Sequence, residues 1–156
     1  MKRYEQKIKS FAEIAKLLAS HSTSSRLKVG CIALKSDFSK IASFGYNGSY
    51  SGAPINPETG TEEDSLESGK SGFIHAEINM IAKFSESDPQ NYIIILTHSP
   101  CIMCTKVLVN AGFKRVYWID EYRETSHLQI FKERNILHGD ISQLIHDYNL
   151  IRPNIY

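Results

Sequence analysis

Residues 92–104 read Tyr-Ile-Ile-Ile-Leu-Thr-His-Ser-Pro-Cys-Ile-Met-Cys, and this stretch decides the fold. Its first five residues are an apolar run rich in isoleucine, which is typical of a strand buried on both faces. Ser99 can cap a helix that follows, Pro100 fits the first turn of that helix, and Gly112 can end it. A second apolar run at residues 115–119 predicts another strand, so the segment is expected to form a βαβ unit with parallel strands.

The segments on either side extend this unit to an α/β domain. Apolar residues recur at helical spacing in residues 4–19 and predict an amphipathic helix. The apolar runs 29–34 and 41–46 are separated by a short polar segment, which predicts an antiparallel hairpin. Further helices are expected at residues 75–84, at residues 128–134 and from Asp140 onward, where Asp140 and Gln143 resemble a capping arrangement.

Length and composition limit the classes of protein that the chain can represent. Its 156 residues suit one domain spanning residues 1–156, and its net charge of +1 predicts no long nucleic acid as a partner. No run approaches the ~18 apolar residues of a membrane-spanning helix, so no membrane partner is expected. The three cysteines, two of them at CxxC spacing, argue against a disulfide framework and favour a reducing compartment, which predicts a cytoplasmic protein.

Two regions are not part of the predicted α/β pattern. Residues 49–72 are rich in glycine, serine, proline and acidic residues, and they are predicted to form a long acidic loop. Loops of this length in a compact domain are usually functional or disordered. Residues 138–156 are expected to form a C-terminal extension of the single domain.

Two short segments far apart in the chain together supply the side chains of a metal site. His75-Ala76-Glu77 offers an imidazole and a carboxylate, and Pro100-Cys101-Ile102-Met103-Cys104 offers two thiols. The imidazole and the thiols make three ligands for Zn²⁺, which leaves the fourth tetrahedral position open for water. Glu77 is the carboxylate left over, and this combination is the signature of zinc-dependent nucleobase deaminases.

The chemistry expected of this pair of motifs is hydrolytic. Both motifs are expected at helix N-termini, where the positive helix end favours the thiolates that zinc needs. Zinc lowers the pKa of its water toward ~7, and Glu77 is expected to move protons between that water, the substrate ring and the leaving ammonia. A structural zinc knuckle would need a fourth protein ligand, and a CxxC redox pair would leave His75 and Glu77 without a role.

Several motifs around the metal ligands resemble the deoxycytidylate (dCMP) deaminase family, and the likeness is nearest to its compact phage-type members. The resemblance covers residues 5–137. It implies the three-layer α/β/α cytidine deaminase-like fold with a central mixed five-stranded sheet, and hydrolysis of dCMP to dUMP and ammonia, feeding dTMP synthesis. It also implies a homo-oligomer, a hexamer or a dimer. The motifs are RLKVGCI at 26–32, FGYNGS at 44–49, HAEIN at 75–79, THSPC at 97–101 and NAGFKRVY at 110–117.

The resemblance also assigns roles to single positions. His75, Cys101 and Cys104 match the zinc ligands, and Glu77 matches the proton shuttle. Asn47 matches the residue that holds the sugar hydroxyl, and the backbone carbonyl of Ser99 is expected to accept from the exocyclic amine. The 5′-phosphate needs cationic or hydroxyl donors at the rim of the pocket. The candidates for this role are Arg26, Lys28, Tyr122 and Arg123.

The chain departs from the family pattern before the HAE motif. Residues 48–74 contain no Cys or His, where many relatives carry ligands for a second zinc, so one zinc per chain is predicted. The family is often activated by dCTP and inhibited by dTTP at a site that includes the Gly-Tyr-Asn-Gly segment. The negative charge of the acidic loop would repel a triphosphate unless a bound Mg²⁺ lies between them. The candidate effector loop comprises Gly45, Tyr46, Gly48 and Ser49.

Two alternative functions stay open. A tRNA adenosine deaminase, or another nucleobase deaminase of the same superfamily acting on adenosine or cytosine, shares both zinc motifs. Such an enzyme should show a basic surface for phosphate contacts, which the near-neutral charge does not favour. A non-catalytic zinc binding module would retain its function when Glu77 alone is changed.

Overall fold

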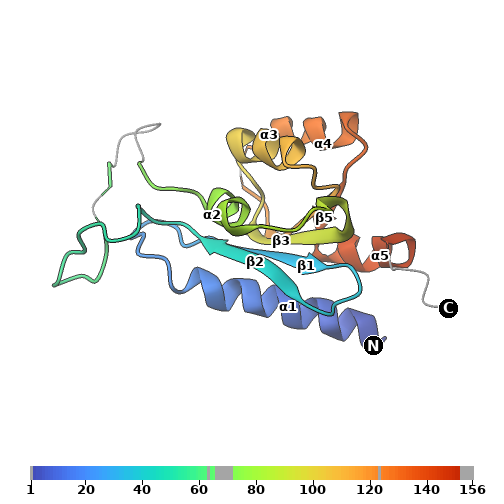
Figure 1. Cartoon of the computed structure of the whole chain (residues 1–156), viewed down its shortest axis with the longest axis horizontal. Coiled ribbons are helices and arrows are strands. Elements are labelled where there is room, and N and C mark those ends of the chain that lie inside the picture. The colour runs from blue at the N-terminus through green and yellow to red at the C-terminus, as the bar shows by residue number, and fades with distance from the viewer. Residues whose placement is uncertain (1, 63, 66–71, 123, 152–156) are drawn as a thin grey trace.

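The structure is a computed structural model that describes residues 2–62, 64, 65, 72–122 and 124–151. Its centre is a five-stranded mixed sheet with the strand order β2-β1-β3-β4-β5 (Figure 1). The first two pairings, β1 with β2 and β1 with β3, are antiparallel, whereas β3 with β4 and β4 with β5 are parallel. The strands are β1 (Gly30–Lys35), β2 (Ile41–Tyr46), β3 (Tyr92–His98), β4 (Arg115–Asp120) and β5 (Leu137–Asp140).

Helices cover both faces of this sheet. One face carries α1 (Arg3–Ala19) and α5 (Ile141–Ile151), and the other carries α2 (Ala76–Lys83), α3 (Ile102–Asn110) and α4 (Gln129–Glu133) (Figure 1). Two short 3-10 turns, η1 (Pro89–Asn91) and η2 (Ser126–Leu128), precede β3 and α4. The three-layer α/β/α fold implied by the family resemblance is therefore confirmed.

The hydrophobic core is divided in two because alternate side chains of a strand point to opposite faces of the sheet. In β3, Ile93 and Ile95 pack toward α1 and α5, whereas Ile94 and Leu96 pack toward α2, α3 and α4. All four side chains are fully buried. A strand that is apolar on both faces thus accounts for the unbroken run Tyr-Ile-Ile-Ile-Leu, and it places β3 at the centre of the sheet.

Two glycines allow helices to approach the sheet closely. A Cβ atom at Gly30 would lie 2.2 Å from the carbonyl oxygen of Ala15 in α1. A Cβ atom at Gly45 would lie 2.2 Å from the carbonyl oxygen of Ala76 in α2 and 2.6 Å from the backbone nitrogen of Met80. Each helix backbone therefore rests directly on the sheet at a position where only hydrogen fits.

The structure corrects the predicted start of α3. The helix is capped by Cys101, whose Sγ accepts from the backbone N–H of Cys104 at 3.4 Å, rather than by Ser99. Ser99 lies two residues earlier, and its hydroxyl accepts instead from the backbone N–H of Tyr122 at 2.9 Å. The cap at Asp140 is confirmed, because its carboxylate accepts from the N–H of Gln143 at 2.9 Å.

The C-terminal part of the chain completes the sheet. Residues 138–140 belong to β5, the strand whose position the hydrophobic pattern did not indicate, and α5 follows directly. Leu144 and Tyr148 of α5 are buried in the core on the α1 side. Within the described part of the chain, no helix is long and apolar enough to cross a membrane.

Candidate metal centre and its pocket

Two helix N-termini bring the three predicted metal ligands together. His75 is the N-cap residue of α2, Cys101 is the N-cap residue of α3, and Cys104 lies in the first turn of α3. The His75 Nδ1 atom lies 3.5 Å from the Sγ of Cys101 and 3.3 Å from the Sγ of Cys104. One ligand atom from each of the three residues lies within 4.8 Å of the others.

These distances fit a tetrahedral zinc ion. Zn–N bonds of ~2.0 Å and Zn–S bonds of ~2.3 Å at tetrahedral angles place nitrogen and sulfur about 3.5 Å apart. The observed separations of 3.3 and 3.5 Å agree with that value. One imidazole and two thiols are also ligands of the type that zinc prefers. The group thus fits zinc with three protein ligands, the pattern of a catalytic rather than a structural site.

The pKa values of the two thiols shift in opposite directions. A hydrogen bond from Cys104 is the main cause that lowers the pKa of Cys101 to about 3. The pKa of Cys104 is raised, chiefly because its thiol donates to Cys101 and also because it is buried. A metal cation between the two sulfurs would take the place of that proton and would favour both thiolates.

Glu77 faces the same pocket from α2. Its side chain is only 4% exposed, and burial is the main cause that raises the pKa of its carboxyl group. A raised pKa makes it easier for the carboxyl group to take up a proton, as a proton shuttle must. Beside it lies a cavity of about 130 Å³ lined by Leu27, Val29, Asn47, His75, Ala76, Glu77, Cys101 and Tyr122. Two of the three metal ligands, His75 and Cys101, therefore line the same cavity as Glu77 and the predicted substrate residues Asn47 and Tyr122.

Asn47 uses its side chain to hold one wall of the cavity. Its Oδ1 accepts from the backbone N–H of Val29 at 2.8 Å, and its Nδ2 donates to the carbonyl of Leu27 at 2.8 Å. Leu27 and Val29 both line the cavity. The amide retains a second hydrogen on Nδ2 and a second lone pair on Oδ1, so contact with a sugar hydroxyl stays a prediction that is compatible with these bonds.

Ser99 and His98 hold Tyr122 in the lining of the cavity. The Ser99 hydroxyl accepts from the N–H of Tyr122, and the Ser99 N–H donates to the carbonyl of Asp120 at 2.9 Å. The ring of His98 stacks on the ring of Tyr122 with centroids 5.5 Å apart. Burial is the main cause that raises the pKa of Tyr122 to about 12, so its hydroxyl stays protonated and can donate a hydrogen bond.

Two other candidates for phosphate binding, Arg26 and Lys28, lie outside the cavity lining. Arg26 is exposed, and its Nη1 donates to the carbonyl of Ser65 in the long loop at 3.3 Å. Lys28 is exposed. Arg123 lies outside the described residues. Of the three candidates that the structure describes, Tyr122 is the one that lines the cavity.

The candidate effector loop is held by contacts within the chain. The Tyr46 carbonyl accepts from Asn79 Nδ2 at 2.9 Å, and Gly45 supports α2 as described above. Gly48 exchanges two backbone hydrogen bonds with Ile74, of 3.1 and 2.6 Å. The Ser49 N–H donates to Oε2 of Glu62 at 2.8 Å. Sequence reasoning did not find this role of Glu62, because its partners Thr23 and Ser49 are distant in the chain.

A three-layer domain with a candidate three-ligand metal site beside a buried carboxylate is typical of catalytic zinc proteins. The sequence profile of the cytidine and deoxycytidylate deaminase zinc-binding region matches residues 5–120, and the chain belongs to this family.

Named relatives agree with this family. The chain is 32% identical over 123 residues to ComE operon protein 2 of Bacillus subtilis (strain 168), covering 77% of this chain and 63% of that protein. It is 30% identical over 118 residues to the deoxycytidylate deaminase of Homo sapiens, covering 74% of this chain and 66% of that protein. The chain thus spans less than two thirds of the length of both relatives.

Among solved structures, the dCMP deaminase from the cyanophage S-TIM5 in complex with dCMP and dUMP is similar over most of both chains. The TM-score is 0.72 at 32% sequence identity, and the alignment covers 90% of this chain and 98% of that one.

Proposed function

We propose that this chain is a zinc-dependent dCMP deaminase that converts dCMP and water to dUMP and ammonia. The observation that carries the proposal is the cavity lined by His75, Cys101 and the buried Glu77, with the Cys104 Sγ 3.3 Å from the His75 Nδ1. The likeness to a phage enzyme of nearly the same length, solved with dCMP and dUMP, supports this substrate. The product would feed dTMP synthesis, in the cytoplasm that the reduced cysteines predict.

The size of the cavity supports a single base as the buried part of the substrate. Pockets for drug-sized ligands measure about 300–1,000 Å³, whereas this cavity measures about 130 Å³. The pyrimidine ring would enter it, and the sugar and the phosphate would lie toward the mouth. Tyr122 and Asn47 line the cavity. Arg26 and Lys28 are exposed residues on either side of Leu27, which also lines the cavity, so their side chains could reach a phosphate at the mouth.

The residues of the chain then divide the work of hydrolysis. His75, Cys101 and Cys104 would hold zinc, which when bound supplies a water of lowered pKa. Glu77 would take a proton from that water and give it to the ring nitrogen of the base, while the water oxygen bonds to the amine-bearing carbon. Glu77 would then move the remaining proton of the new hydroxyl to the amine, so that the C–N bond breaks, ammonia leaves and a carbonyl is formed. The burial that raises the pKa of Glu77 suits this alternation, because the carboxyl group must accept and release protons in turn. The Ser99 carbonyl would accept a hydrogen bond from the exocyclic amine.

The experiment that tests the proposal is a spectrophotometric assay with four substrates at equal concentration: dCMP, deoxycytidine, cytosine and adenosine in RNA. We expect dCMP to give the highest kcat/KM. Preference for adenosine in RNA would instead favour the tRNA deaminase, and no turnover of any of the four by zinc-loaded protein would favour a non-catalytic zinc module.

The proposal extends to the assembly and its control. We propose one zinc per chain, a homo-oligomer that is a dimer or a hexamer, and no Mg²⁺ requirement unless a nucleoside triphosphate binds. Light scattering after size exclusion measures the assembly. Titration of the initial rate with dCTP and with dTTP, each with and without Mg²⁺, measures the response of the candidate effector loop.

A further inference from the structure

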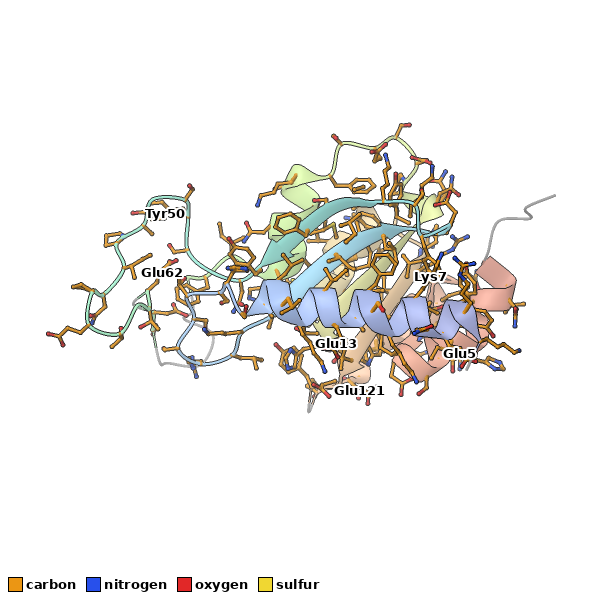
Figure 2. The ribbon with its side chains drawn as sticks, turned by 90° about the horizontal axis from the view of Figure 1, so that it is seen from below. Glu5, Lys7, Glu13, Tyr50, Glu62 and Glu121 are labelled. Carbon is orange, nitrogen blue, oxygen red and sulfur yellow. The ribbon has the colours of Figure 1, made fainter. Side chains whose placement is uncertain are left out.

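The carboxylate of Glu62 joins three segments of the chain that are distant in sequence. Its Oε1 accepts from the hydroxyl of Thr23, and its Oε2 accepts from the backbone N–H of Ser49 at 2.8 Å. Its own backbone N–H donates to the carbonyl of Thr23 at 3.1 Å. Glu62 lies on the loop that projects beyond the end of the sheet, as Figure 2 shows, and it ties this loop to the segments that precede β1 and follow β2.

Both partners of Glu62 lie next to residues that continue to the pocket. Ser49 follows Gly48, which pairs with Ile74 through two backbone hydrogen bonds, and Ile74 directly precedes the metal ligand His75. Thr23 follows Ser22, whose hydroxyl donates to the carbonyl of Asn47 at 2.7 Å. Short, continuous hydrogen-bonded links thus run from Glu62 to two walls of the cavity.

The contacts of Glu62 require a side chain that can bond to two partners at once. Two donors converge on the two oxygens of one half-buried side chain, and hydrogen bonds to an ionised acceptor are about twice as strong as neutral ones. Glu58 on the same loop differs: it is exposed, and within the described part of the chain its carboxylate accepts no hydrogen bond. Glu58 is therefore a matched control of the same type and charge on the same loop.

We propose that Glu62 is a positioning residue for the substrate pocket, an inference that rests on the proposed function. Its carboxylate fixes the Ser49 backbone and Thr23, and through them it holds the Asn47 wall and the entry to His75 in the geometry that binds the nucleotide. Glu62 does not touch the reacting atoms. Its loss is therefore expected to weaken substrate binding and to leave the chemical step and the metal in place.

The test compares Glu62→Ala, Glu62→Gln and Glu58→Ala with wild type in the zinc-loaded full-length protein. Glu62→Ala removes both side-chain hydrogen bonds of the carboxylate, and we expect it to raise KM for dCMP on the order of tenfold, with kcat within about threefold and zinc content unchanged. Glu62→Gln retains an acceptor for the Ser49 N–H and can donate to the Thr23 hydroxyl, so it should restore most of the loss. Glu58→Ala should match wild type.

Amide hydrogen exchange supplies a readout that does not depend on turnover. We expect faster exchange at Ser49 and Ile74 in Glu62→Ala, and unchanged exchange in Glu58→Ala. If Glu62→Ala proves too unstable to purify, Thr23→Val removes one donor and keeps the carboxylate, and it should raise KM in the same direction by a smaller factor.

The failures of the two proposals can be told apart. Wild-type protein that does not deaminate dCMP overturns the proposed function; unchanged exchange at Ser49 in Glu62→Ala would then overturn the positioning role as well. Wild-type turnover combined with an unchanged KM in Glu62→Ala overturns the positioning role alone. Equal KM increases in Glu62→Ala and Glu58→Ala would also overturn it, because they would report a general effect of loop charge.

Discussion

Gly45→Ala tests whether the close contact between β2 and α2 holds the metal ligands in place. The added Cβ would lie 2.2 Å from the Ala76 carbonyl oxygen and 2.6 Å from the Met80 nitrogen. Both atoms belong to the helix backbone, so no side-chain rotation can relieve the clash. Ordinary contact begins at 3.4 Å, so the helix and the strand must separate by 1.2 Å at this point.

The expected cost of that separation is large. Overpacking of a well-packed interior costs about 1–3 kcal/mol, and a clash with backbone on both sides belongs at the upper end, about 3 kcal/mol. For a chain of this size that corresponds to a decrease in Tm of about 6–12 °C. His75 is the N-cap residue of α2 and Glu77 lies in its first turn. Because of this, a displacement of α2 by about 1 Å should also reduce kcat/KM by about 10²-fold.

Thermal unfolding, zinc content and kcat/KM for dCMP should be measured for Gly45→Ala beside the control Gly72→Ala. A Cβ at Gly72 meets no atom within 4 Å, so this variant should behave as wild type. If Gly45→Ala melted within about 2 °C of Gly72→Ala and retained full activity, the contact would not position α2 and our reasoning would be refuted.

Three further predictions concern the metal and the substrate. Glu77→Gln should bind zinc as wild type does and lose about 10²–10⁴-fold in kcat, because the proton shuttle is gone; wild-type turnover would rule out that role. Treatment with a chelator should abolish deamination and lower the Tm, and one equivalent of Zn²⁺ per chain should restore both, whereas two zinc ions per chain by metal analysis would contradict a single site. Arg26→Ala should raise KM for dCMP more than for deoxycytidine, and equal effects on both substrates would remove Arg26 from the phosphate site.

The parts of the fold that depend on local patterns were predictable from the sequence. The unbroken apolar run of β3 predicts a buried strand, and the helical period of α1 predicts an amphipathic helix. The metal ligands are also predictable, because they lie within the short CxxC and HAE motifs. In contrast, β5 contains one large apolar side chain, Leu137, in four residues at the edge of the sheet. A strand so short and half-exposed has no hydrophobic signature, so only the family resemblance implied it.

Contacts between distant segments could not be predicted for the same reason. Ser99 has the composition of a helix cap, yet its hydroxyl bonds to Tyr122, 23 residues along the chain. In the sequence, Glu62 is one of several acidic residues of a predicted loop. The folded chain places its carboxylate between Thr23 and Ser49. Gly45 was assigned to a candidate effector loop, and the structure shows a packing requirement at that position that no local pattern records.

The one tryptophan of the chain, Trp118, lies at 1% exposure in β4, packed on the side that carries α2, α3 and α4. Its indole N–H finds no hydrogen-bond acceptor within the described part of the chain. A dry, unbonded indole emits at short wavelength and shifts to the red on contact with water. The molecule therefore contains a single indole, which can be excited selectively over the eight tyrosines, and its emission can follow unfolding of the metal-bearing half of the core without any label.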